Sequence, residues 1–463
     1  MIKKKSGEVY SSVIVFALLF LHRILLFYSL NINYTFDSYD YIARDGFAFL
    51  TGNVDRYRLP VYPMIIDIFQ RIITRNIDMA ICIFQMILSL VSIVVLYLTV
   101  KKITKNHSVS LVVTSFYSTL ASVGSWDKIL LTESISLSLA VFILYGIVSY
   151  LLEYKVRYAA LTSVLLVIGC FLRAVFVIYA GMFLGALILI MVISLFAKKT
   201  DNIKDGLIGI GVSAVPVILV LVYACCFYSN YGAYTISDSG LGQQLYIVLQ
   251  YDMYRDCTDN EISASADEIL NSDLDQEGSK DIDSNIGKRV VDILNEQTGN
   301  ASKLHYLNKY SIARMYIMET FSREEVKSFV DVSMKNHRDL NNYRILTSAL
   351  DEFSMTRYNR VAYDRGTQTL YNILTVTSLI SFNLIPLIVI ALIEVVVFFY
   401  NLLRKKKQEW IRLGLGAFIM STVVLALVGT NDEYARTAIT SLPFMFTALG
   451  LYISAIVNKL SHR

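Results

Sequence analysis

Residues 37–63, DSYDYIARDGFAFLTGNVDRYRLPVYP, place acids, tyrosines and arginines directly after the first long apolar segment of the chain. The stretch contains two carboxylates, Asp37 and Asp40, and it ends in the turn Arg-Leu-Pro-Val-Tyr-Pro at 58–63. A loop that only connects two helices needs no such set, whereas binding residues are often carried on loops. An acid, aromatic faces and a guanidinium beside a lipid boundary suit a charged and partly lipidic ligand.

Asp37 has two interpretations. A carboxylate at the end of a membrane span, just outside the hydrocarbon, can be a general base that removes the proton of an acceptor hydroxyl. It can also be the N-cap of a short helix, because Asp is common at helix starts. On Asp37 alone the N-cap is favoured, and the neighbouring residues shift the balance toward chemistry.

Arg58 and the tyrosines around it also have two interpretations. Arg58 precedes Pro60, whose ring fixes the backbone φ angle, so its guanidinium is held in a rigid turn. Arginine binds phosphate through planar, bidentate contacts, and Tyr41 and Tyr62 offer rings for stacking on a sugar or hydroxyls for a phosphate. The alternative is ordinary anchoring of arginine and tyrosine at the membrane interface. Both interpretations stay open on these residues alone.

A second group of charges lies at the expected outer ends of other spans. Arg173 stands in the apolar context CFLRAVF, where a cation is costly unless it reaches water, phosphate or a carboxylate. Arg23, inside the first span, raises the same question, and a structural ion pair is the alternative for both arginines. The further charged residues at this level are Asp127, Glu133, Glu433 and Arg436. Together with Asp37 and Asp40 they predict a ring of charge on one face of a membrane.

The composition indicates a membrane protein. The 463 residues are 55% hydrophobic and 17% charged, and the mean hydropathy is +0.51. Apolar runs of roughly 20 residues, the length that crosses a bilayer as a helix, recur along the chain. We predict an all-α polytopic membrane protein with about ten transmembrane helices. The spans are expected near 10–30, 78–100, 108–125, 133–152, 157–172, 175–197, 206–229, 369–402, 411–430 and 436–457.

Basic residues support this number of spans. With ten spans, every lysine and arginine cluster between the spans falls on the same side, which the positive-inside rule assigns to the cytoplasm. Both termini are then cytoplasmic. The clusters are those at 3–5, 101–105, 155–157, 198–204, 404–407 and 459–463. The net charge of +4 is therefore a topological bias and no sign of nucleic-acid binding.

The spans divide the chain into three parts. Residues 1–229 are expected to form an N-terminal transmembrane module, with interfacial helices in its first external loop at 31–76. Residues 230–368 form a small, mostly helical extracytoplasmic domain, and 369–463 form the C-terminal transmembrane helices. The sequence contains no Walker A, zinc-type, nucleophile-elbow or Rossmann motif. Its five cysteines have no metal-ligand spacing.

The order of the loop motifs resembles the GT-C fold glycosyltransferases, a class that includes protein O-mannosyltransferases, lipid A aminoarabinose transferases and bacterial polysaccharide-modifying transferases. DSxxY from Asp37 followed by RxPxYP from Arg58 is similar to their first external loop. LTES at 131–134 is similar to their second loop, and Arg436 with Pro443 is similar to their late loop. The motifs cover the two ends of the chain and leave out the middle domain.

The chain departs from the family pattern at several positions. Ser38 stands where many relatives have Glu, and Arg44 where Ala is common. Thr437 and Thr440 replace a usual Tyr and Pro of the late loop. These departures weaken what the resemblance implies about metal use and about the exact contacts of the late loop.

The resemblance implies a donor sugar carried on a polyprenyl phosphate, with Asp37 matching the catalytic acid and Arg58 matching a basic residue that holds the donor phosphate. The hypothesis is an inverting transfer to a hydroxyl on a glycan, lipid or protein acceptor. In it Tyr41, Tyr62, Arg173 and Arg436 bind the phosphate or sugar of the donor, and Asp40, Asp127, Glu133 and Glu433 are supporting acids.

The resemblance also implies expectations for cofactors, partners and cellular location. No cofactor is certain, and a divalent cation is left open. The partners are the lipid-linked donor, the acceptor and membrane lipids, with no nucleic acid. The expected location is the bacterial inner membrane, with the site on the periplasmic or extracellular side.

Two alternatives have different consequences. An O-antigen or capsule polymerase would share the large external part and the outward arginines. A transporter or flippase for lipid-linked sugars would instead place its charges near the membrane midplane, between repeated halves. The charges of this chain cluster at the predicted outer face, which favours a transferase.

Overall fold

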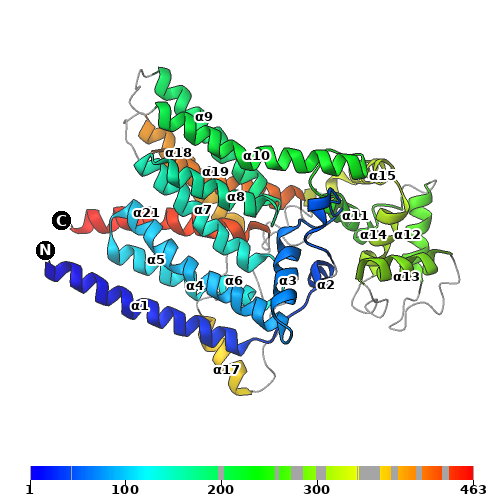
Figure 1. Cartoon of the computed structure of the whole chain (residues 1–463), viewed down its shortest axis with the longest axis horizontal. Helices are drawn as coiled ribbons and strands as arrows, with labels where there is room; N and C mark the ends of the chain where they lie inside the picture. The colour runs from blue at the N-terminus through cyan, green and yellow to red at the C-terminus, as the bar shows by residue number, and fades with distance from the viewer. Residues whose placement is uncertain are drawn as a thin grey trace.

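The chain is an all-α polytopic membrane protein, seen here in a computed structural model (Figure 1). The structure describes residues 2–42, 44–196, 203–255, 260–272, 285–298, 309–340, 342–343, 365–376, 384–402, 409–429 and 437–461. A bundle of long apolar helices carries both termini at one end, and a group of short helices covers the other end (Figure 1). Within these ranges the β-structure is limited to one isolated bridge, which pairs Asn33 with Ile129. This bridge ties the first external loop to the second.

Seven helices within the described ranges are long and apolar enough to cross a membrane. They are α1 (Ile2–Ser29), α4 (Ile77–Thr104), α7 (Glu133–Glu153), α9 (Val175–Phe196), α10 (Ile203–Tyr231), α19 (Glu409–Gly429) and α21 (Leu442–Ser461). Three further predicted spans correspond to other helices: α8 (Val156–Cys170) and α18 (Leu384–Leu402), which are shorter apolar helices, and α5 (His107–Thr119). Each of the ten predicted spans thus corresponds to a helix, and seven of those helices have the length to cross on their own.

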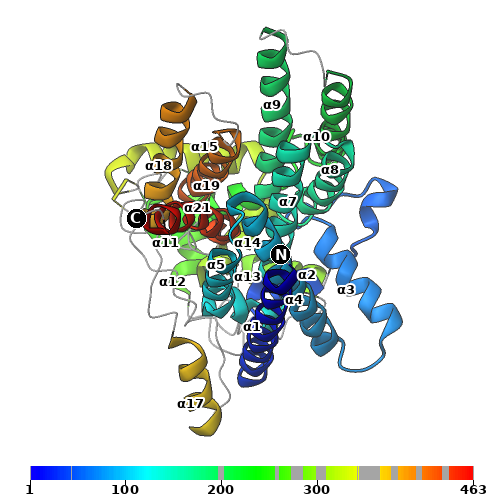
Figure 2. The same ribbon diagram turned by 90° about the vertical axis from the view of Figure 1, so that its left-hand side faces the viewer.

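The predicted span over 369–402 is wrong in one respect. Its first part belongs to a separate helix, α17 (Arg365–Leu374), which has no buried residue and packs against α1. The second part, α18, begins at Leu384 and packs against α19. Figure 2 shows α17 standing apart from α18 at the edge of the bundle. The sequence is apolar across much of this region, and hydropathy alone does not show that one helix ends at Leu374 and another begins at Leu384.

Two ion pairs with buried carboxylates lie inside the bundle. Arg23 of α1 pairs with Asp127 at 2.5 Å, and both side chains are almost completely buried. Ser134 also donates a hydrogen bond to Asp127, at 2.6 Å. Glu394 of α18 pairs with Arg412 of α19 at 3.1 Å. A charge inside a membrane bundle is tolerated when it is paired in this way, so these residues join helices.

Basic residues from alternate predicted loops meet at the end of the bundle where the termini lie. Lys101, at the end of α4, pairs with Glu8 of α1 at 3.3 Å. Lys102 pairs at 2.5 Å with Glu153, the last residue of α7. These contacts place three segments that the charge pattern assigns to one side at the same end of the molecule, as that assignment requires.

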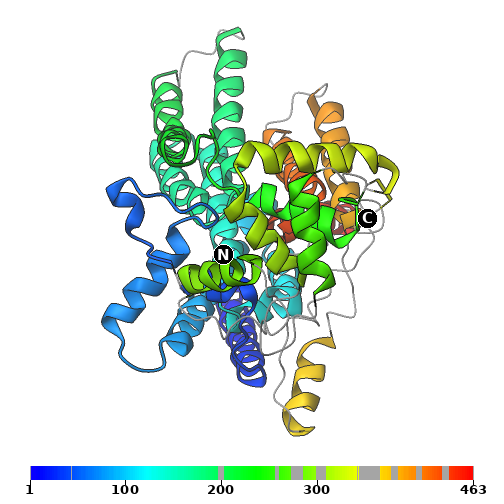
Figure 3. The same cartoon turned by 90° about the vertical axis from the view of Figure 1, so that its right-hand side faces the viewer.

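Short helices form the opposite end. The first external loop contains α2 (Phe36–Ile42), the 3₁₀ turn η1 (Ala48–Thr51) and α3 (Val61–Ile72). Five further helices form a unit that is called the external unit here, after the side of the membrane predicted for it. They are α11 (Ser239–Gln250), α12 (Glu261–Asn271), α13 (Asn285–Thr298), α14 (Lys309–Thr320) and α15 (Arg323–Asn336). These five helices share an apolar core of their own. Figure 3 shows the green and yellow-green helices of the external unit beside the blue first loop.

Asp238 joins the external unit to the first loop. Its completely buried carboxylate accepts from Arg56 at 3.0 Å through one oxygen and from Arg323 at 2.7 Å through the other. Its backbone N–H donates to the carbonyl of Arg56 at 2.8 Å. The Tyr57 hydroxyl donates to Glu319 at 2.6 Å. Both the backbone and the side chains of residues 56–57 in the first loop therefore form hydrogen bonds or ion pairs with the external unit.

A labelling experiment checks which end of the bundle faces outward. In a cysteine-free background, Asn53→Cys and Lys327→Cys should both react with a membrane-impermeant thiol reagent added to intact cells. Lys155→Cys should react only after permeabilisation, because its loop belongs to the basic side. All three positions are exposed, so burial cannot explain a lack of reaction. Labelling of Lys155→Cys in intact cells would contradict the topology.

Candidate functional site

Arg58 is the centre of the candidate site. Its Nη2 donates to Asp37 Oδ1 at 2.5 Å, and its Nε donates to Asp40 Oδ2. Asp37 and Asp40 lie three residues apart on α2, so one face of this short helix presents both carboxylates to the guanidinium. The backbone N–H of Arg58 also donates to Asp55 at 2.7 Å, which fixes the turn in front of Pro60. Asp37 and Arg58, two of the residues that the sequence analysis assigns to the site, are therefore in direct contact.

The N-cap interpretation of Asp37 is wrong. Asp37 lies in the first turn of α2, inside the helix, and its carboxylate contacts Arg58. Thr35 takes the place of the cap, since its hydroxyl and carbonyl both accept from the Ser38 backbone N–H. The Ser38 hydroxyl in turn accepts from the Thr35 backbone N–H at 2.9 Å. Ser38, where many members of the resembled class have Glu, is thus a buried part of the turn that begins α2.

Asp40 is clamped by two arginines. Besides Arg58, it binds Arg44, whose Nη2 and Nε reach Asp40 Oδ1 at 2.7 and 3.1 Å. Burial by itself would raise the pKa of Asp40, but the charges and hydrogen bonds of Arg58 and Arg44 outweigh it and hold the pKa below its ordinary value. A carboxylate with a lowered pKa is a poor proton acceptor at neutral pH. Asp40 therefore serves to position the two arginines.

Tyr41 packs against Arg58, and Tyr62 packs against Tyr41. The Arg58 guanidinium lies 4.7 Å from the centroid of the Tyr41 ring, a cation–π distance. The Tyr41 ring meets the Tyr62 ring edge to face at 5.0 Å. Tyr62 is completely buried, and its hydroxyl donates to Gln85 of α4 at 3.0 Å. The Tyr62 hydroxyl is thus used inside the protein, although the sequence analysis assigned Tyr62 to the donor.

Arg173 lies in a neighbouring ion pair. Its Nη1 is 3.1 Å from Glu133 Oε1, and the carboxylate is completely buried at the start of α7. The turn before Arg173 contacts the first loop directly, because the Val61 backbone N–H donates to the Phe171 carbonyl at 3.0 Å. The structure therefore brings the ion pair of Arg173 and Glu133 close to α3.

Three predicted site residues remain. Asp127 lies in its buried pair with Arg23 inside the bundle, where it joins helices. Glu433 and Arg436 lie outside the described residues. Their proposed roles stay predictions from the sequence.

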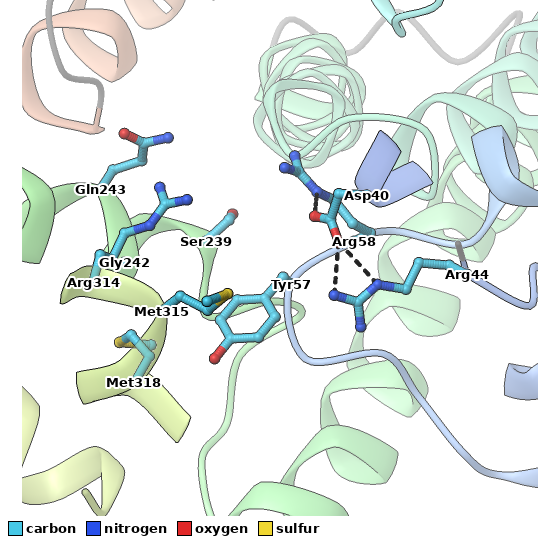
Figure 4. A pocket seen from close by; sticks show the side chains of 10 residues that line it. All are labelled: Asp40, Arg44, Tyr57, Arg58, Ser239, Gly242, Gln243, Arg314, Met315 and Met318. Carbon is cyan, nitrogen blue, oxygen red and sulfur yellow. Dashed lines mark hydrogen bonds and ion pairs between the residues drawn. The ribbon is translucent and has the colours of Figure 1, made fainter. Parts of the chain in front are cut away.

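A pocket opens between the first loop and the external unit (Figure 4). Its empty volume is about 530 Å³, including its mouth. Asp40, Arg44, Tyr57 and Arg58 line it on the side of the first loop; Ser239, Gly242 and Gln243 of α11 and Arg314, Met315 and Met318 of α14 line it on the other side. The sequence analysis missed all six residues from the external unit, because no motif marks them and their partners lie far away in the chain.

The carboxylates of the candidate site are engaged by arginines. No three His, Cys, Asp or Glu side chains in the described ranges come close enough together to share a divalent cation. Asp37 and Asp40 both accept from Arg58.

Two solved structures are similar to the chain. One is the archaeal oligosaccharyltransferase AglB from Archaeoglobus fulgidus in complex with an inhibitory peptide and a dolichol-phosphate, at 11% identity and a TM-score of 0.46 over 99% of this chain and 52% of that chain. The other, the Archaeoglobus fulgidus oligosaccharyltransferase in the apo form, gives 11% identity and a TM-score of 0.46 over 97% and 51%. The chain thus spans about half the length of these proteins. No protein-family model and no curated protein sequence matches the chain.

Proposed function

We propose that the chain is a membrane glycosyltransferase that moves a sugar from a polyprenyl-phosphate carrier to an acceptor hydroxyl. The observation that carries the proposal is the contact between Asp37 and Arg58 beside the pocket. A carboxylate and a guanidinium side by side supply the two things this transfer needs, a proton acceptor and a stabiliser of the leaving phosphate. The acceptor can be a glycan, a lipid or a protein.

The reaction follows from these roles. The acceptor oxygen attacks the anomeric carbon from the face opposite the phosphate, so the configuration inverts. The proton of the acceptor hydroxyl passes to Asp37. The bond between the anomeric carbon and the phosphate oxygen breaks, and its electron pair leaves on the lipid phosphate. The cost of that growing charge falls when guanidinium groups are already in place to receive it.

The ion pair between Asp37 and Arg58 gives the free enzyme a resting state. While Arg58 holds Asp37, the carboxylate is stabilised as an anion and is a weak base. A donor phosphate that takes over the Arg58 Nη2 contact would release Asp37 toward the acceptor hydroxyl. This exchange couples donor binding to activation of the base, and Asp40 keeps Arg58 in place through its Nε.

The activity is tested with the purified full-length protein and a panel of polyprenyl-phosphate sugars. Sugar transfer should release lipid phosphate in proportion to the product formed. Release without any glycosylated product would indicate hydrolysis, and no release from any donor, at any acceptor tested, would overturn the proposal. A transporter would move the intact donor across vesicles with no lipid phosphate formed.

Arg58→Ala is expected to weaken donor binding by about tenfold or more, because a charge-assisted hydrogen bond contributes about 1.5–3 kcal/mol. Arg58→Lys should restore only part of this affinity, since lysine lacks the fork that contacts Asp37 and Asp40 together. The measurement is the affinity for a polyprenyl phosphate. Arg75→Ala removes one exposed arginine from the same loop and is the control. Equal affinity in Arg58→Ala and wild type would assign Arg58 to interface anchoring.

A further inference from the structure

Arg314 of α14 forms no ion pair with the residues that the structure describes. It projects from α14, half-buried, between residues that are themselves buried in the external unit. Within the described part of the chain, no carboxylate oxygen lies within ion-pair distance of its guanidinium. The centroid of the Tyr246 ring lies 5.8 Å from Arg314 Cζ, a cation–π distance. Burial lowers the pKa of Arg314, and the charges of Asp37 and Asp40, which raise it, offset only part of this effect.

The other arginines of the pocket are compensated. Arg58 is paired with Asp37 and Asp40, and Arg44 is paired with Asp40 and Asp55. Arg314 lies on the opposite side of the pocket from these pairs, next to the amide of Gln243 (Figure 4). The pocket therefore keeps one positive charge on the wall formed by the external unit, and this charge is directed at the space a ligand would fill.

We propose that Arg314 binds the phosphate group of the lipid-linked substrate, so that the external unit supplies part of the anion site. The inference rests on the proposed function for the identity of the substrate. A guanidinium is weakly hydrated and matches the geometry of phosphate oxygens, so it is suited to such a contact in a partly desolvated pocket.

The wall around Arg314 fits a phosphate that carries an apolar chain. Met315 and Met318 line the pocket beside it, and methionine packs adaptably against irregular apolar groups. Ser239 and Gln243 add hydroxyl and amide donors for oxygens. Gly242 lies beside the arginine stem, since a Cβ at this position would be 3.8 Å from Arg314 Cδ, an ordinary van der Waals distance.

The test measures binding, so its outcome does not depend on sugar transfer. The probes are a polyprenyl phosphate and the matching polyprenol, added to the full-length protein in nanodiscs. Arg314→Met should lower the affinity for the phosphate by about ten- to a hundredfold, the range expected for a lost hydrogen bond to a charged group. The affinity for the polyprenol should not change. Arg314→Lys should keep part of the phosphate affinity.

Two more variants separate this role from a structural one. Lys327→Met removes one exposed positive charge from the same unit and should bind the phosphate as wild type does. Gln243→Glu places a carboxylate on the same wall as Arg314 and should weaken phosphate binding although Arg314 is still present. This second variant keeps the test valid if Arg314→Met does not fold.

The outcomes are distinct for the two proposals. Unchanged phosphate affinity in both Arg314→Met and Gln243→Glu would overturn the role of Arg314, whatever the enzyme transfers. Equal binding of polyprenyl phosphate and polyprenol to the wild-type protein would overturn it as well. If phosphate binding depends on Arg314 but no sugar is transferred, the anion site stands and the proposed reaction fails.

Discussion

Asp37→Asn is expected to lower the rate of sugar transfer by about 100- to 10,000-fold, the usual contribution of a general base. The amide keeps the shape of the side chain and can still accept a hydrogen bond from Arg58, so the fold of the loop should persist. It cannot take up the acceptor proton. The measurement is the single-turnover rate of transfer at saturating donor, together with the affinity for polyprenyl phosphate, which should change little.

Asp45→Asn is the matched control for this variant. Asp45 is an exposed acid of the same loop, and its side chain accepts only locally, from the Phe47 backbone N–H at 2.8 Å. An asparagine oxygen can keep that hydrogen bond, so Asp45→Asn should transfer at nearly the wild-type rate. If Asp37→Asn retains more than half of the wild-type rate, Asp37 is a structural partner of Arg58 and the base lies elsewhere.

Asp238→Ala is expected to destabilise the contact between the external unit and the first loop by about 3–5 kcal/mol, the cost of removing one partner from a buried ion pair. The carboxylate is completely buried, and its loss leaves both Arg56 and Arg323 without this anion. The thermal unfolding midpoint of the full-length protein should fall. The arginines of the first loop should also become cleavable in limited trypsin digestion.

Asp331→Ala on α15 is the control, because it removes an exposed acid from the same unit. A surface change of this kind usually alters stability by no more than about 0.5 kcal/mol. Wild-type melting and protease resistance in Asp238→Ala would show that the buried carboxylate contributes little to holding the two parts together.

Local sequence patterns predicted much of the fold and part of the site. Long apolar runs identify α4, α7 and α9, because burial in a membrane demands them. Asp37 and Arg58 could be found because they lie in one loop, where short spacing already implies proximity. The N-cap assignment of Asp37 failed since Thr35 was available two residues earlier for the same task.

Contacts between distant segments could not be read from the sequence. Asp238 contacts Arg56 although 182 positions separate them in the sequence, and no motif near either residue predicts this ion pair. Arg314 looks like any basic residue on the surface of a predicted helix until α14 is packed against the first loop. The end of α17 was missed for a related reason, because hydropathy alone does not fix the path of a helix.

The three consecutive residues 56–58 contact two different parts of the protein. Arg56 and Tyr57 bind the external unit, while Arg58 binds the carboxylates of α2. Since the backbone between them is one short segment, the external unit cannot leave without disturbing the position of Arg58. Docking of the external unit and binding of a ligand in the pocket are therefore thermodynamically linked. If docking strengthens ligand binding by a given free energy, the bound ligand strengthens docking by the same free energy.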